Sequence, residues 1–157
     1  MKTIVIGLGN PILGDDGVGW VVAEKISKLK SCESTEVVVD CLSVGGLTLM
    51  EHLVGFDRAI VVDALQTTLY PVGTVFHLRL EDLPEQIIGH LASAHDVNLK
   101  TALQLGREMG AQLPEEIIIV GIVAHSVTNF SKNLSSNVLA AVPQAIQIIY
   151  NLLQTAV

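Results

Sequence analysis

The sequence is short of the residues on which several classes of protein depend. Its 157 residues include 2 cysteines, 4% aromatic and 16% charged residues, and 9 lysines and arginines stand against 16 acidic side chains. The two cysteines, Cys32 and Cys41, cannot build a disulfide scaffold, and their spacing does not match a zinc site. A net charge of −7 argues against nucleic-acid binding, which depends on a basic surface facing the phosphates.

Long hydrophobic runs are also missing, although 50% of the residues are hydrophobic. No apolar run reaches the roughly 18–20 residues that cross a membrane, so we expect no membrane span. Residues 1–3 lead directly into a strand-like run, without the longer apolar stretch of a signal peptide. We therefore expect one cytoplasmic domain over residues 1–157, since a domain usually has about 100–200 residues.

Four short apolar runs rich in β-branched residues predict the strands of a parallel sheet. Their hydrophobicity is continuous rather than alternating, which is typical of parallel strands covered by helices on both faces. The runs are residues 3–6, 36–39, 59–62 and 116–120.

A fifth strand is predicted at residues 74–79, which mix polar and apolar side chains. Only ten residues separate it from the strand before it. Since a crossover to a parallel strand needs about a dozen residues or more, we predict an antiparallel edge strand there.

Apolar residues at helical spacing predict four helices, at residues 18–29, 47–54, 97–109 and about 135–152. Pro143 falls inside the last of them, so we expect a kink or the start of a new helix there. The predicted fold is α/β, a three-layer α/β/α sandwich. Its sheet is mostly parallel, with about five strands and one antiparallel edge strand.

The residues that follow each strand are the candidates for a site, because ligands of open parallel sheets bind beyond the carboxyl ends of the strands. Asp16 follows the first strand, Asp63 ends the third, and His95 lies in the long loop after the edge strand. Two carboxylates and an imidazole suit zinc or nickel, with one position left for water or substrate. We predict that these three residues converge at one end of the sheet and form an open metal site.

Each of these residues also has an ordinary structural interpretation. Asp16 stands where an N-cap of the next helix would lie, and His95 is typical of a polar loop. Asp63 closes an apolar strand, where an unpaired charge is costly, so a partner or a metal is expected. His90 is the weaker histidine candidate in the same loop as His95.

Four further residues are candidates for substrate contacts. Asp40 ends the second predicted strand, Gly45 and Gly46 lie in the loop after it, and His125 follows the fifth strand. Cys41 has no histidine near it in the sequence, so we expect a packed thiol rather than a nucleophile.

The loop after the first strand admits three interpretations. A dinucleotide-binding fingerprint would need glycine where Ile12 stands, and an acidic residue before the helix would occupy the anion site. Gly-Leu-Gly-Asn-Pro is also similar to the start of peptidyl-tRNA hydrolases. Here Gly-Asp-Asp-Gly replaces the Thr-Arg-His-Asn segment of that family, and an acidic protein binds tRNA poorly.

The third interpretation covers nearly all of residues 1–150. The pattern Gly7-x-Gly9-Asn10-x-x-x-x-Asp15-Asp16-Gly17-x-Gly19 resembles the N-terminal signature of the hydrogenase maturation endopeptidases. The resemblance continues, in order and spacing, through Val62-Asp63-Ala64, Pro71-Val72-Gly73-Thr74, Ser93-Ala94-His95 and Val120-Gly121-Ile122. It implies a three-layer α/β/α fold.

The resemblance also implies an activity: removal of the C-terminal tail of a nickel–iron hydrogenase large-subunit precursor after nickel insertion. Asp16, Asp63 and His95 match the family's metal-binding residues, and the family has either Glu or Asp at the first position. The implied nickel is supplied by the precursor, and no tightly bound organic cofactor is expected.

One loop departs from the family pattern. Many members have Asp-Gly-Gly-Thr after the second strand, whereas this chain has Asp40-Cys41-Leu42-Ser43-Val44-Gly45-Gly46. Which hydrogenase is recognised therefore stays open. Two other functions would use the same three residues: a self-contained metal-dependent peptidase or hydrolase, and a non-catalytic nickel-binding maturation module.

Overall fold

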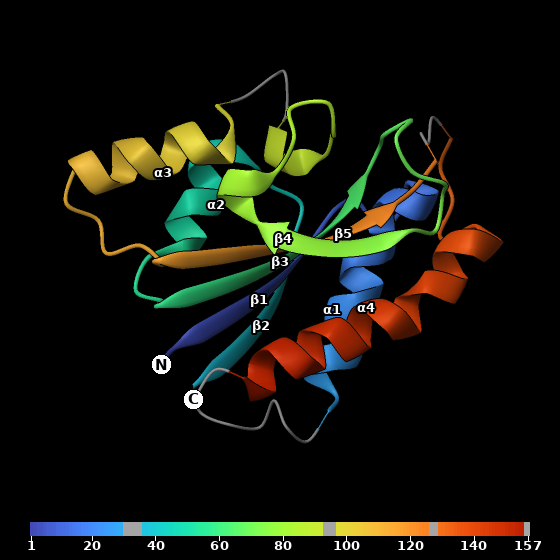
Figure 1. Ribbon diagram of the computed structural model, residues 1–157, viewed down its shortest axis with the longest axis horizontal. Coiled ribbons are helices and arrows are strands. Elements are labelled where there is room, and N and C mark those ends of the chain that lie inside the picture. Colours follow the sequence, from blue (N-terminus) through green and yellow to red (C-terminus); the bar gives the residue numbers. More distant parts are fainter. Residues whose placement is uncertain (30–35, 93–96, 126–128, 156–157) are drawn as a thin grey trace.

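The fold is built on one five-stranded sheet, seen in a computed structural model that describes residues 1–29, 36–92, 97–125 and 129–155. The strand order is β2-β1-β3-β5-β4 (Figure 1). All neighbours are parallel except β4, which runs antiparallel to β5 at one edge. This confirms the predicted sheet and its antiparallel edge strand. The strands are β1 (Thr3–Leu8), β2 (Val37–Leu42), β3 (Arg58–Leu65), β4 (Val75–Arg79) and β5 (Glu116–Val123).

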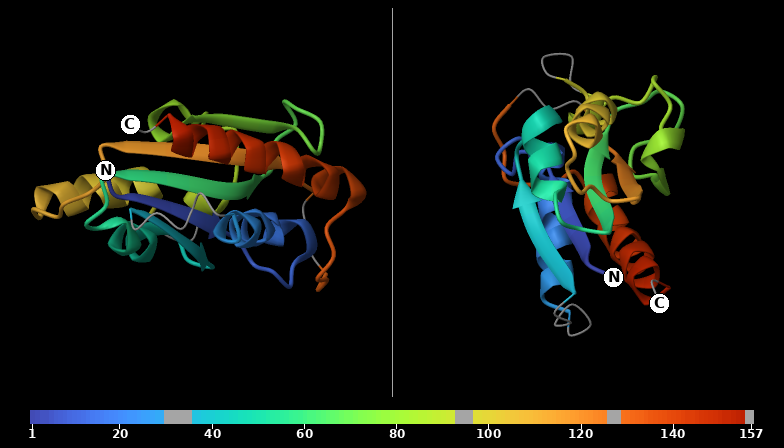
Figure 2. Two further views of the ribbon diagram at one scale, coloured as in Figure 1. Left: turned by 90° about the horizontal axis from the view of Figure 1, so that it is seen from below. Right: turned by 90° about the vertical axis from the view of Figure 1, so that its left-hand side faces the viewer.

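Helices cover both faces of the sheet and complete the three predicted layers (Figures 1 and 2). Helices α1 (Val18–Ser27) and α4 (Ser136–Gln154) lie on one face, and α2 (Gly46–Leu53) and α3 (Leu99–Glu108) on the other. Helix α4 runs unbroken through Pro143, so the prediction that a new helix could begin there was wrong. Among the described residues, no helix is both long and apolar enough to span a membrane.

Each face of the sheet has its own apolar core, which explains the continuous hydrophobic runs. Alternate residues of a strand point to opposite faces. Ile4 and Ile6 belong to the core under α2 and α3, and Val5 between them belongs to the core under α1 and α4. A strand in the middle layer therefore needs apolar side chains at every position.

The four parallel strands run further than the sequence predicts, and in β2 and β3 this changes the position of an acidic residue. β2 continues past Asp40 to Leu42, and β3 continues past Asp63 to Leu65. Asp63 pairs in register with Gly121 of β5. The prediction that these aspartates end their strands was wrong, because the apolar residues after each of them also join the sheet.

Two glycines of the N-terminal signature let α1 lie directly on the sheet. A Cβ on Gly7 would overlap the backbone carbonyl of Gly19, and a Cβ on Gly19 would overlap the carbonyl oxygens of Leu8 and Val62. The obstacles are backbone atoms, which cannot move aside without shifting the strands. This close contact fixes the start of α1, and with it the loop that carries Asp16.

We predict that Gly19→Ala lowers the free energy of unfolding by about 1–3 kcal/mol, the usual effect of overpacking a core. Gly106→Ala is the matched control, since Gly106 is also helical but faces the thioether of Met50, a flexible side chain. It should change stability by less than about 1 kcal/mol, because the helix propensity of alanine offsets mild crowding. Urea denaturation of both variants measures the difference, and equal stabilities would contradict this account of the packing.

Candidate functional site

A buried carboxylate lies in the middle of an otherwise apolar strand face. Ala59, Val61 and Leu65 of β3 belong to the core under α2 and α3. Asp63 has the same strand parity and a side chain that is 0% exposed. Its Oδ2 accepts a hydrogen bond from the backbone N–H of His90 at 2.9 Å, and its Oδ1 lies 2.9 Å from His90 Nδ1. The partner that the sequence requires for Asp63 is therefore His90.

Asp16 reaches the same histidine from the loop after β1. It lies in a short 3-10 turn, η1 (Gly14–Gly17). Its Oδ2 accepts a hydrogen bond from the backbone N–H of Asn10 at 2.9 Å and lies 3.2 Å from His90 Nε2. No side-chain hydrogen bond caps α1, whose N-cap is Gly17. The interpretation of Asp16 as a helix N-cap was therefore wrong.

Gly9 gives this loop its shape. Its φ is +139°, and a Cβ there would overlap the backbone carbonyl of Asp16. Only glycine allows so close an approach in this conformation. The Gly9-Asn10 pair thus folds back on Asp16 and donates the Asn10 N–H to its carboxylate.

His90 begins the 3-10 turn η4 (His90–Ala92) and bridges the two carboxylates with its two ring nitrogens. The hydrogen bond to Asp16 has the largest effect on the imidazole and the hydrogen bond to Asp63 the second largest. Together they raise the pKa of His90 to about 10. Burial raises the pKa of Asp63, and the hydrogen bonds from His90 offset part of that rise. The imidazolium ion of His90 therefore lies between the carboxyl groups of Asp16 and Asp63 and contacts both of them.

The predicted metal set is brought together only in part. Asp16 and Asp63 approach one another through His90, while His95 lies outside the described residues. Within the described ranges, no three His, Cys, Asp or Glu side chains are arranged to hold a metal. The ring nitrogens of His90 face different carboxylates, so these donors do not converge on one point. His90, the weaker histidine candidate in the sequence, is thus the residue that joins Asp16 to Asp63, and its place in the loop after β4 is the one sequence feature that points to it.

Asp15 has a different role from its neighbour Asp16. Its residue is only 3% exposed, and its carboxylate accepts hydrogen bonds from the N–H and hydroxyl of Ser135 at 2.6 and 2.8 Å. A longer bond, of 3.4 Å, comes from the backbone N–H of His125. Asp15 thereby joins the β1 loop to the end of β5 and the start of α4.

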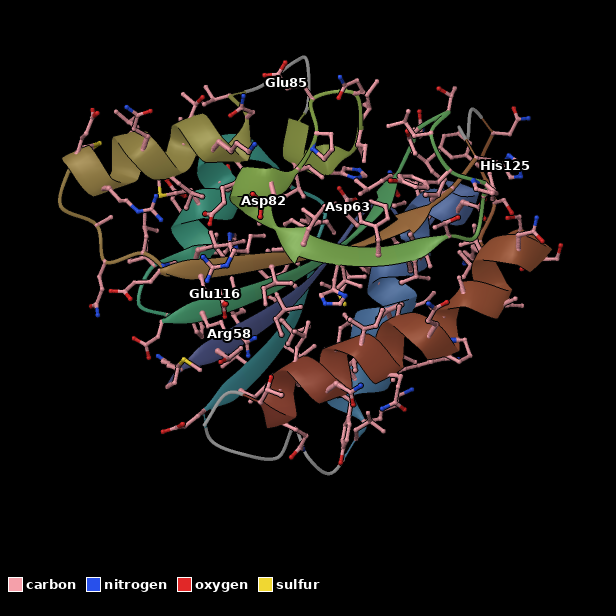
Figure 3. The ribbon with its side chains drawn as sticks, in the orientation of Figure 1. Arg58, Asp63, Asp82, Glu85, Glu116 and His125 are labelled. Atoms are coloured by element: carbon pink, nitrogen blue, oxygen red, sulfur yellow. The ribbon has the colours of Figure 1, made fainter. Side chains whose placement is uncertain are left out.

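A cavity of about 140 Å³ opens beside Asp16, enough for several water molecules. It lies beyond the carboxyl ends of β3 and β5, where ligands of such sheets bind. His125 and Asp63 lie toward this end of the sheet, and Arg58 and Glu116 toward the opposite end (Figure 3). The lining residues are Leu13, Asp16, Ala64, Gln66, Ala124 and His125.

The structure places the predicted substrate residues unequally. His125 lines the cavity. Gly45 packs closely against the backbone of His90, because a Cβ there would lie only 3.1 Å from the His90 carbonyl oxygen. Gly46 begins α2 directly after it. Asp40 is exposed on the edge strand β2, and its carboxylate accepts a hydrogen bond from the N–H of Cys41 at 2.8 Å. Asp40 thus lies in the same sheet as Asp63. Among the described residues, it makes no contact with Asp16, Asp63 or His90.

Comparison with known proteins identifies the family. A family model described as hydrogenase maturation protease matches residues 21–152. The chain belongs to the hydrogenase maturation protease family. Because the matched range begins after the Asp16 loop, it supports the family independently of the N-terminal signature at residues 7–19.

Individual hydrogenase maturation proteases agree with this assignment. A putative hydrogenase maturation protease of Methanocaldococcus jannaschii is 33% identical over 150 residues, which cover 93% of this chain and 92% of that protein. The hydrogenase 2 maturation protease of Escherichia coli is 25% identical over 81% of this chain and 76% of its own length.

Solved structures of family members share the fold. The hydrogenase maturating endopeptidase HybD of E. coli superposes with a TM-score of 0.76 at 22% identity, covering 98% of this chain and 93% of that one. The [NiFe] hydrogenase maturation protease HybD of Thermococcus kodakarensis gives a TM-score of 0.69 at 26% identity, with coverage of 97% and 99%. The three-layer architecture is therefore that of the family.

We predict that Asp15→Ala lowers the free energy of unfolding by about 1–3 kcal/mol, because it leaves the partly buried N–H of Ser135 without its acceptor. Ser135→Ala is the control that removes only the hydroxyl contact, and it should lower stability by about 0.5–1 kcal/mol, less than Asp15→Ala does. Urea midpoints measure both. Equal losses in the two variants would show that the Asp15 carboxylate does not hold this junction.

We predict that Cys41 is a slow nucleophile. Burial, and after it the carboxylates of Glu24 and Asp40, raise the pKa of its thiol to about 11. In a Cys32→Ser variant, iodoacetamide should alkylate Cys41 at pH 8 at least about tenfold more slowly than a peptide thiol, because less thiolate is present. The same variant in urea is the control and should react at the ordinary rate. Fast alkylation of the folded protein would contradict the packed-thiol interpretation.

Proposed function

We propose that this protein is the endopeptidase that removes the C-terminal tail of a nickel–iron hydrogenase large-subunit precursor after nickel insertion. The precursor's nickel serves as the recognition element. The observation that supports this most is the approach of two carboxylates, from the β1 loop and from β3, on one imidazole beside a cavity. Family membership supports the protease activity, and the site supports the choice of residues.

The donor chemistry fits a nickel ion carried by the substrate. Carboxylate and imidazole ligands without a thiolate form an exchangeable site rather than a closed structural one. Asp16, Asp63 and His95 are the residues that would complete the coordination of the nickel. A nickel ion held by these residues would supply Lewis-acid chemistry, polarising the scissile carbonyl or a water molecule and helping to position the tail.

The two aspartates differ in what they can do for the reaction. Asp63 is fully buried and held by the His90 backbone, so its part is to bind and to orient. Asp16 has a side chain that is 24% exposed and lines the cavity. A general base must lie within hydrogen-bond reach of the water that it activates, and Asp16 meets this condition better.

The precursor tail would enter the cavity beside Asp16. Gln66 and His125 offer polar groups on its wall, and the Gly45–Gly46 loop lies against the His90 backbone. These residues, with Asp40 on the exposed edge of the same sheet, are the proposed contacts of the substrate.

A cleavage assay with the large-subunit precursor tests the proposal. We expect Asp16→Asn to slow cleavage by at least about 100-fold, the lower range for loss of a general base. Asp63→Asn should also slow cleavage strongly, because it removes a charge that would bind and orient the metal. Asp82→Asn, an exposed acidic residue in η3 (Leu80–Asp82), is the matched control and should cleave normally. Full activity of Asp63→Asn would contradict the assignment of the site.

The same assay tests the dependence on nickel. Precursor without inserted nickel should be cleaved much more slowly than the nickel-loaded form. Equal cleavage of both would refute the recognition role of the ion and would favour a self-contained peptidase. Nickel binding with no cleavage of either form would favour a non-catalytic maturation module.

A further inference from the structure

The imidazole of His90 lies where two carboxylates would otherwise face one another. Its Nδ1 is 2.9 Å from Asp63 Oδ1, and its Nε2 is 3.2 Å from Asp16 Oδ2. Both nitrogens of the ring are used, one for each acid. A ring in this position blocks the direct approach of any cation to both carboxylates together.

We propose that the His90 imidazole is an internal occupant of the metal position between Asp16 and Asp63, and that it must leave before both carboxylates can bind a divalent metal. The inference rests on the proposed function, which assigns these two aspartates to the metal. It adds a residue that competes with the metal instead of binding it.

The backbone around His90 allows the ring to leave while Asp63 stays in place. The N–H of His90 donates to Asp63 Oδ2, separately from the ring contact at Oδ1. Gly89 lies so close to Asp63 and Leu65 that a Cβ there would overlap both side chains, which holds the backbone against β3. Rotation of the side chain alone would therefore free Oδ1 and leave the anchor at Oδ2 intact.

The ring also has a way out, because the His90 side chain is 31% exposed whereas Asp63 is 0% exposed. Asp16 keeps its hydrogen bond from the Asn10 N–H when the imidazole departs. Both carboxylates thus retain a backbone donor in either state, and the ring is the part that moves.

Such an occupant makes the site selective for a metal that arrives with other contacts. When only a fraction of the protein is in the state that can bind a ligand, the apparent affinity for that ligand is reduced in proportion to that fraction. A free metal ion must displace the ring unaided, whereas an ion held by a docked precursor brings the binding energy of that protein. The resting site therefore discriminates against free metal.

Calorimetric titration of the full chain with NiCl2 alone tests the inference. If the open state is populated at about 10% or less, His90→Ala should bind nickel at least about tenfold more tightly than the unsubstituted protein. His77→Ala removes an exposed histidine of β4 and is the matched control, with unchanged affinity expected. Unchanged or weaker binding by His90→Ala would overturn the inference, and weaker binding would make His90 a ligand.

A second measurement keeps the test independent of the stability of that variant. In NMR spectra of the 15N-labelled unsubstituted protein, ZnCl2 should move the chemical shifts of the His90 ring nitrogens toward those of a solvent-exposed imidazole. A shift to metal-bound values would overturn the inference.

Asp63→Asn separates this inference from the proposed function. If Asp63→Asn binds nickel as the unsubstituted protein does, the metal assignment of the proposed function fails. If Asp63→Asn loses binding while His90→Ala gains none, only the role of His90 fails.

Discussion

The burial of the Asp63 carboxylate is the constraint on which the arrangement of the site depends. An ionisable group with no solvent contact in an apolar layer is stable only with hydrogen-bond partners. The backbone N–H and the ring of His90 supply those partners. They draw the loop that follows β4 across the carboxyl end of β3. Asp16 then meets the other side of the same ring. One buried charge thus explains why segments from three parts of the chain lie together.

The apolar layers make this possible because they hold the surrounding backbone rigid. The contact of Gly7 with Gly19 sets α1 against the sheet, and the hydrogen bonds of Asp15 tie the β1 loop to the start of α4. The two neighbouring aspartates of this loop therefore have different roles. Asp15 is structural and buried, whereas Asp16 reaches the cavity. A loop fixed at both ends can present a carboxylate with little loss of conformational entropy when a substrate binds.

Membership in the hydrogenase maturation protease family gives this geometry a chemical context. In the structure both carboxylates are paired internally through His90, beside a cavity with polar walls. Under the proposed function, this pairing suits a reaction that begins only when the precursor docks. Under the proposed function, the exposed edge at Asp40 and the Gly45–Gly46 loop are the proposed contacts of the substrate, so substitutions there would alter partner recognition and leave the two carboxylates in place.

The layers and most of the helices and strands could be predicted from the sequence, because continuous apolar runs and helical spacing are local patterns. The sequence also placed Asp16 and Asp63 at the correct end of the sheet, since chain direction in a parallel sheet fixes that end. It did not determine that β3 runs on past Asp63, which depends on pairing with β5. It also did not determine which histidine meets Asp63. The contact between His90 and Asp63 depends on the folded path of a loop, because the two residues are 27 positions apart and no local spacing encodes such a path.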